Sequence, residues 1–125
     1  MTVSGAGSDI WGAADSFAFV YQPLRDGGVF AELSSQNNTN PFAKFGVMIR
    51  KTLDPGSPMV ILDVKPDGGI EFMTRSAQGA ETTFIAAGSA TVSTDTDGRI
   101  KMNVVLQLAR LGNSVSGFYC DLTAG

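Results

Sequence analysis

Hydrophobic and polar residues alternate with a period of two along most of this chain, and clusters of Gly, Pro, Asn and Asp separate the alternating segments. A period of two places successive side chains on opposite faces of a β-strand, and almost no segment has the 3.6-residue period of an amphipathic helix. The segments that we expect to be strands are 17–24, 29–36, 42–52, 59–65, 70–76, 81–92, 100–109 and 114–122. The pattern therefore predicts an all-β domain of about eight strands.

Turn residues between these segments predict how some of them pair. The stretch 25–28 is expected to join 17–24 to 29–36 in one hairpin, and 66–69 to join 59–65 to 70–76 in another. The Gly- and Ala-rich residues that precede the first strand, 4–15, are expected to form a loop. Short strands at regular spacing favour a sandwich or a barrel over any βαβ fold, and we expect an antiparallel β-sandwich. A chain of 125 residues is enough for one domain, 1–125.

The segment 100–109 also contains good helix formers. Its apolar residues alternate cleanly, however, and the Gly-Asn pair at 112–113 follows at hairpin spacing. We interpret it as a strand whose buried face carries Met102, Val104, Leu106 and Leu108.

Composition and charge exclude several classes of partner. The chain is 43% hydrophobic and 17% charged, which is typical of a folded globular domain. Its net charge is −3, and its Lys and Arg residues are scattered, so we expect no nucleic-acid partner. No apolar run is long enough to span a membrane, and the N-terminal residues lack the pattern of a signal peptide, so we expect no membrane partner.

The absence of histidine is the strongest argument against an enzyme. It removes the commonest general base, the Ser-His and Cys-His nucleophile pairs and the commonest ligand of transition metals. Cys120 is the single cysteine, so no disulfide can form within the chain, and we expect it to be a half-buried strand residue. We therefore predict no catalytic residue, no metal site and no cofactor.

Two acidic groups remain as candidates for chemistry. Asp63 and Glu71 would face each other across the second hairpin, as the two carboxylates of a glycosidase do, but an exposed sheet face balanced by Lys65 and Arg75 explains them more simply. The run Asp95-Thr96-Asp97-Gly98 resembles part of a calcium loop, although a hairpin turn accounts for it as well and is the interpretation that we favour.

Aromatic residues are the usual platform for sugar rings, and Trp11 is the most informative of them because it lies among Gly, Ala and Asp residues. Trp11 is either an exposed stacking residue or a lid over one end of the sandwich. We favour the lid.

Three segments carry a family resemblance: SGAGSDIWGAADSFAFVYQPL at 4–24, NTNPFAKFGVMIRKTLDPGS at 38–57 and LARLGNSVSGFY at 108–119. They resemble the bacterial DUF1349-like and laminin G-like or concanavalin A-like modules that accompany secreted glycoside hydrolases and other multidomain surface proteins. The resemblance implies a concanavalin A-like or jelly-roll sandwich, carbohydrate binding, and a secreted or cell-surface protein.

The chain departs from that family pattern in two respects. Modules of this kind usually have strands beyond both ends of the present chain, so the resemblance implies truncation at both ends, and Phe42 stands where a Trp is common. Missing strands would expose sheet edges and part of the core, which proteins manage by pairing or oligomerising. We therefore expect a homo-oligomer, with a dimer favoured.

The leading hypothesis is a non-catalytic module that binds a glycan, either near Trp11 or on one sheet face. That face is expected to carry Met48, Arg50, Asp63, Glu71, Met73 and Arg75. Arg50 and Arg75 would offer planar donors to sugar hydroxyls. The first alternative is a structural or protein-interaction domain that self-associates without a ligand, with exposed Met48 and Met73 as adaptable contacts. The second alternative is a glycosidase that uses Asp63 and Glu71.

Overall fold

The computed structural model describes residues 9–16, 25–36 and 42–123. These residues form ten strands and contain no helix. The strands are β1 (Asp9–Trp11), β2 (Ala14–Ser16), β3 (Gly27–Gln36), β4 (Phe45–Arg50), β5 (Met59–Val64), β6 (Gly69–Arg75), β7 (Thr83–Ser89), β8 (Ser93–Thr94), β9 (Ile100–Leu111) and β10 (Ser114–Asp121). No described helix could therefore span a membrane.

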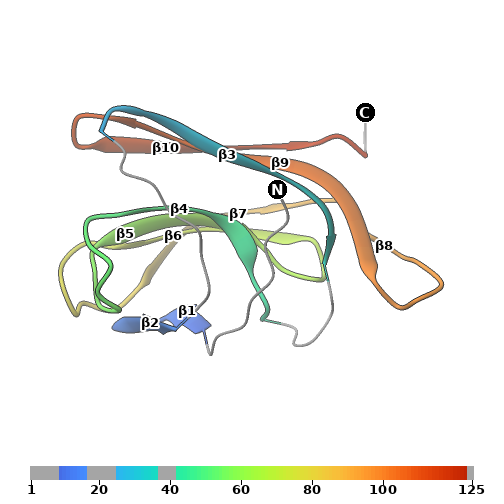
Figure 1. Cartoon of the computed structure of the whole chain (residues 1–125), viewed down its shortest axis with the longest axis horizontal. Helices are drawn as coiled ribbons and strands as arrows, with labels where there is room; N and C mark the ends of the chain where they lie inside the picture. The colour runs from blue at the N-terminus through green and yellow to red at the C-terminus, as the bar shows by residue number, and fades with distance from the viewer. Residues whose placement is uncertain (1–8, 17–24, 37–41, 124–125) are drawn as a thin grey trace.

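Eight of the strands form two antiparallel sheets that pack face to face (Figure 1). One sheet has the order β4-β5-β6-β7, so each of its strands pairs with its neighbour in sequence. The other has the order β10-β9-β3, and short β8 pairs with the start of β9. The predicted antiparallel β-sandwich of about eight strands is confirmed, and β1 and β2 add a small hairpin beneath the β4–β7 sheet (Figure 1).

The core lies between the two sheets and is built by the alternation in β9. Met102, Val104, Leu106 and Leu108 are buried, and they pack on apolar side chains of β3 to β6. Each fully buried side chain of this size contributes roughly 1.5–3 kcal/mol to folding. The segment 100–109 is thus a strand, as its alternation predicted, and the strand continues to Leu111.

The structure bears differently on the two predicted hairpins. The hairpin of β5 and β6 is confirmed, and its turn is closed by the Lys65 N–H, which donates to the Gly69 carbonyl at 2.9 Å. The other predicted hairpin joins 17–24 to 29–36, and its first strand, 17–24, lies outside the described part of the chain. The described partner of β3 is β9, with Leu33 opposite Val104.

The prediction of a loop at 4–15 is wrong for its described part, which contains β1 and the start of β2. Each of these strands has only three residues, which is too short for an alternation to be recognised in the sequence. Gly12, at the turn, has φ +64°, which glycine adopts without steric cost. The hairpin packs through Ile10, which is buried with Met59, Ile61 and Met73.

Trp11 therefore does not serve as the expected lid. It follows Ile10 in β1 and keeps 49% of its surface exposed. The side chain that closes this face of the sheet is Ile10.

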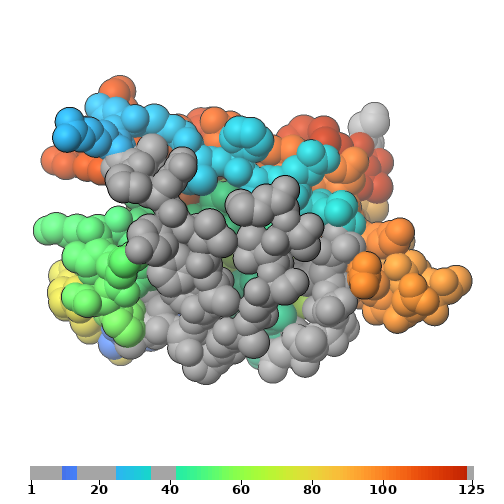
Figure 2. Space-filling model, viewed as in Figure 1, coloured from blue at the N-terminus to red at the C-terminus, as the bar shows by residue number. Residues whose placement is uncertain are grey.

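The two sheets do not match in width. In one layer β10, β9 and β3 are the long strands, and they lie against four strands in the other layer. β3 packs above β4, and at the opposite side Gly117 of β10 lies against Phe72 of β6. Tyr119 of β10 reaches Gly88 of β7, where an added Cβ would lie 2.6 Å from the tyrosine ring. At one end of the sandwich the turn after β8 projects as a knob (Figure 2).

Candidate functional site

The outer face of the β4–β7 sheet is the face on which the sequence placed the binding residues. Pairing brings Met48, Ile61 and Met73 into one row and sets Asp63 opposite Glu71 in the next. Because Leu62 and Val64 face the core, the six candidates of β4, β5 and β6 do share the opposite face.

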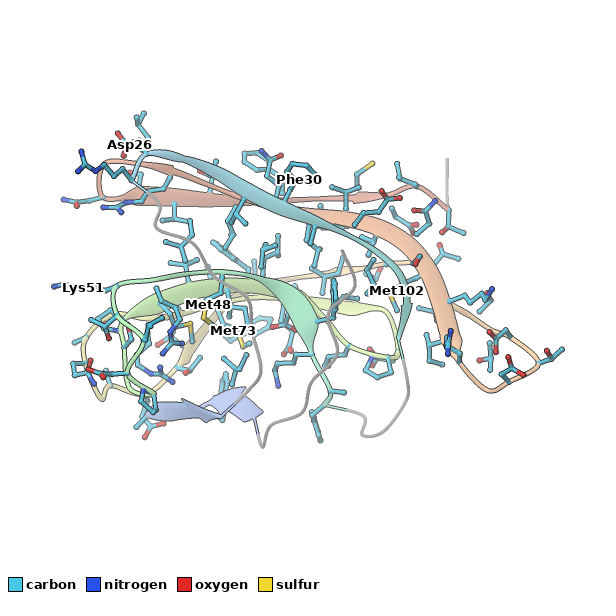
Figure 3. The ribbon with its side chains drawn as sticks, viewed as in Figure 1. Asp26, Phe30, Met48, Lys51, Met73 and Met102 are labelled. Atoms are coloured by element: carbon cyan, nitrogen blue, oxygen red, sulfur yellow. The ribbon has the colours of Figure 1, made fainter. Side chains whose placement is uncertain are left out.

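The expectation that this face is exposed is wrong. Asp63 is 0% exposed, Met73 is fully buried, and Arg75 is 1% exposed. The β1–β2 hairpin is one physical cause, because Ile10 packs on Met73, and the side chains of Met48 and Met73 lie on the side of the sheet that faces this hairpin (Figure 3). Met73 is therefore a core residue and cannot serve as the adaptable surface contact that we expected.

Arg75 is a structural clamp, because its donors are used within the chain. Its guanidinium donates to the hydroxyl of Thr82 at 3.2 Å and to the carbonyls of Gly12 at 3.0 Å, Ala80 at 3.0 Å, Ser57 at 3.1 Å and Pro55 at 3.2 Å. The Thr82 hydroxyl in turn donates to the Gly12 carbonyl at 2.8 Å. These bonds tie the β1–β2 turn to two distant loops, so Arg75 has no donor geometry left for an external sugar.

Arg50 also bonds to its own neighbourhood. Its guanidinium donates to the carbonyls of Thr52 at 3.2 Å and Asp54 at 2.5 Å and contacts the Met48 sulfur at 3.2 Å. The bonds to Thr52 and Asp54 are exposed to solvent, so they shape the loop after β4 without anchoring the core.

Asp63 and Glu71 form a buried carboxyl pair. Both Asp63 oxygens and Glu71 Oε1 are shielded from solvent and have no donor from another described residue. The pKa of Asp63 is raised from 3.8 to about 8, chiefly by burial and then by the neighbouring Glu71, while Lys44 and Lys65 oppose the shift. The raised pKa favours the protonated form of the Asp63 carboxyl near neutral pH.

Position 46, beside this carboxyl pair, has room only for glycine. Gly46 lies opposite Asp63 in β4, and a Cβ there would lie 2.1 Å from the Leu62 carbonyl oxygen and 2.9 Å from the Asp63 Cβ. The two carboxyls line neither the cavity beside Tyr119 nor the cavity beside Thr91, and Asp63 is 0% exposed, so a glycoside cannot reach Asp63 directly. The geometry gives a shielded pair within the protein rather than an open pair of glycosidase acids.

The Asp95–Gly98 run forms a turn. The Asp95 carboxylate accepts from the backbone N–H of Asp97 at 2.9 Å and of Arg99 at 3.0 Å, and Gly98 has φ +79°. Within the described ranges, no three acidic or cysteine side chains gather closely enough to hold a metal ion.

A different surface presents exposed aromatic side chains. On the outer face of the β3–β9–β10 sheet, Phe30 and Phe118 both lie opposite Gln107, one on each side. Phe30 is 72% exposed and Phe118 is 55% exposed. Phe30 points away from the second sheet (Figure 3). We call the row Phe30–Gln107–Phe118 the aromatic platform.

The rows beside the aromatic platform are also open. Glu32 and Cys120 flank Val105 in one of them, and both are exposed. Cys120 is thus not the half-buried residue that we expected. The face combines apolar rings with an amide and a carboxylate, so it can offer stacking surfaces and hydrogen bonds together.

Sequence analysis missed the aromatic platform although its signal was present. The alternation that places Val29, Ala31 and Leu33 inward already places Phe30 outward. That Phe118 belongs to the same row depends on β9 lying between β3 and β10, and this order cannot be obtained from local pattern.

Comparisons with known proteins add no family or relative. No family model matches the chain, and neither a curated protein nor a solved structure matches it. The functional argument therefore depends on the surfaces described above.

Proposed function

We propose that this chain is a non-catalytic binding module that holds a glycan on the aromatic platform. The observation that carries the proposal is the row of two exposed Phe rings with one amide between them on an open sheet face. Neighbouring strands are about 4.8 Å apart, so the two rings stand roughly 10 Å apart, a span that suits every second unit of an extended sugar chain.

The chemistry of the row suits a sugar chain. Sugars have apolar C–H faces that stack on aromatic rings and hydroxyl edges that need hydrogen bonds, and the Gln107 amide offers both donors and an acceptor. The face is open rather than hollowed, which favours an extended ligand over a small enclosed one. The resemblance to DUF1349-like and laminin G-like modules supports the same class of ligand.

The proposal moves the site away from the face expected from sequence. Arg75 and Met73 are buried there, and the carboxyl pair is shielded, so that face offers no comparable surface. A non-catalytic role is also supported by the burial of Asp63, because both oxygens of its carboxyl group are shielded from solvent.

The test is a glycan screen followed by affinity measurements on the purified chain. Phe30→Ala and Phe118→Ala are each expected to weaken binding of any hit roughly three- to tenfold, since one aromatic contact is worth about 0.5–1.5 kcal/mol beyond its area. The affinity change is measured by isothermal titration calorimetry.

The matched control is Phe84→Ala. Phe84 is a half-exposed ring in β7, opposite Met73 and on the outer face of the other sheet, so its loss should leave affinity unchanged. A folded chain that binds no glycan, or a hit that depends on Phe84 and not on Phe30, would contradict the proposal.

A second candidate function is self-association without a small ligand. The observation that favours it is the edge of β10, which carries no charged residue from Ser114 to Cys120.

A further inference from the structure

β10 is an edge strand without the usual protection against pairing. It pairs with β9 over all eight residues with no shift in register, and its other side has no partner among the described strands. From Ser114 to Cys120 it contains no charge and no proline, and most of it is exposed. Natural sheets usually protect such an edge with charges, prolines or bulges, because unpaired backbone groups recruit another strand.

The edges at β3, β4 and β7 carry that protection. β3 has the exposed Glu32, and β4 ends in Arg50 and is followed by Lys51. In β7 the register shifts where Ile85 is inserted between Phe84 and Ala86, which is a bulge at mid-strand. Of these four edges, β10 is therefore the one best suited to pairing.

The layer mismatch shows that there is room for one more strand beside β10. Tyr119 of β10 lies against Gly88 of β7, and β7 is exposed along most of its length. An apolar cavity of about 110 Å³ opens there between the layers, lined by Phe72, Ala86, Gly88, Gly117 and Tyr119 among others. A strand added at the free edge of β10 would lie above β7 and cover this opening.

We propose that the added strand is β10 of a second copy, paired antiparallel about a two-fold axis with Phe118 opposite the second copy's Phe118. In this register Gly117 lies opposite the second copy's Tyr119, so the smallest residue meets the largest one, an arrangement known to stabilise sheets. Asp121 lies opposite the second copy's Val115, so the two acidic groups do not face each other. The strand is thus complementary to itself in size and charge, as an isologous interface requires.

Pairing in this register joins two aromatic platforms end to end. The row Phe30–Gln107–Phe118 continues across the axis into the same row of the second copy, so the partner contributes residues to the site. This doubled platform rests on the proposed function, whereas the β10 interface does not.

The first experiment fixes the register by thiol cross-linking. In the proposed dimer Ser116 lies opposite the second copy's Cys120, so Ser116→Cys should give a covalent dimer in high yield with a short bifunctional thiol reagent. Ser114→Cys lies on the same face but opposite the second copy's Leu122, and it should give much less. A higher yield from Ser114→Cys than from Ser116→Cys would overturn the register.

The second experiment uses sedimentation velocity without any glycan, from about 1 to about 100 μM, a range that covers moderate to weak association. The unmodified chain and Phe30→Lys should sediment as dimers, and Phe118→Lys as a monomer, because it places two lysines opposite each other at the axis. Phe30→Lys is the matched control, since it puts the same charge on the same face at the far edge of the sheet.

A monomeric unmodified chain would overturn the inference. The remaining explanation of the open β10 edge would then be that it pairs with an extended segment of a different protein. A dimer that survives Phe118→Lys and not Phe30→Lys would overturn it as well. A dimer that binds no glycan would remove the proposed function and keep the interface, so the two failures can be told apart.

Discussion

Arg75→Met is expected to lower the free energy of unfolding by at least about 3 kcal/mol, a large part of the stability of a domain this size. The substitution removes the guanidinium, so the partly buried carbonyls of Ser57 and Ala80 lose their donor, and the Gly12 carbonyl loses its bonds from Arg75 while it keeps those from Thr82. The change is measured by urea denaturation followed by tryptophan fluorescence, which reports on Trp11 in the clamped hairpin.

Two further variants make this result specific. Arg50→Met removes the same functional group from solvent-exposed bonds and should cost less than about 1 kcal/mol. Thr82→Val removes one arm of the network and should give an intermediate loss that can be measured even if Arg75→Met does not fold. Similar losses from Arg50→Met and Arg75→Met would contradict the clamp.

Asp63→Asn is expected to stabilise the protein at pH 8 by several kcal/mol and to change little at pH 4. The folded pKa of Asp63 is raised from 3.8 to about 8, so between these values the folded state keeps a proton that the unfolded state releases. Wild-type stability should therefore be highest below pH 4 with respect to this group and fall as the pH rises to about 8. Its contribution to the slope is at most about 1.4 kcal/mol per pH unit.

Asparagine fits the site because its size is close to that of the acid and its amide can donate to Glu71. The measurement is urea denaturation at intervals from pH 4 to pH 9, with Asp97→Asn at an exposed turn as the control for a lost acidic group. The variant should show a flatter profile than both the wild type and the control. An unchanged slope in Asp63→Asn would contradict the raised pKa of Asp63.

The fold could be predicted from the sequence wherever a strand was long enough to show its period. β9 alternates over most of its length, so its buried residues Met102 to Leu108 were correctly identified. The prediction that Asp63 and Glu71 lie opposite each other on one face was also correct. β5 and β6 are joined by a short turn, and this turn fixes which residues pair.

Burial on the outer face could not be predicted in the same way. Asp63 and Arg75 look like surface charges because nothing near them in sequence covers them. Part of the cover comes from a hairpin of two three-residue strands, and the contact that holds this hairpin joins Gly12 to Arg75, 63 residues away. Period and spacing carry no information about a contact at that separation, so the burial of this face was not predicted.

The clamp has a consequence for the order in which the chain acquires structure as it is made. β1 and β2 leave the ribosome first, yet the donors that hold their turn, Arg75 and Thr82, follow 63 and 70 residues later. At a synthesis rate of about 5–20 residues per second, this delay amounts to roughly 3–14 seconds. During that interval the hairpins β4–β5 and β5–β6 can form from local pairs. The β1–β2 hairpin still lacks Arg75 and Thr82, and β3 still lacks β9. Nascent-chain folding should thus begin in the middle of the sequence and reach its first residues late.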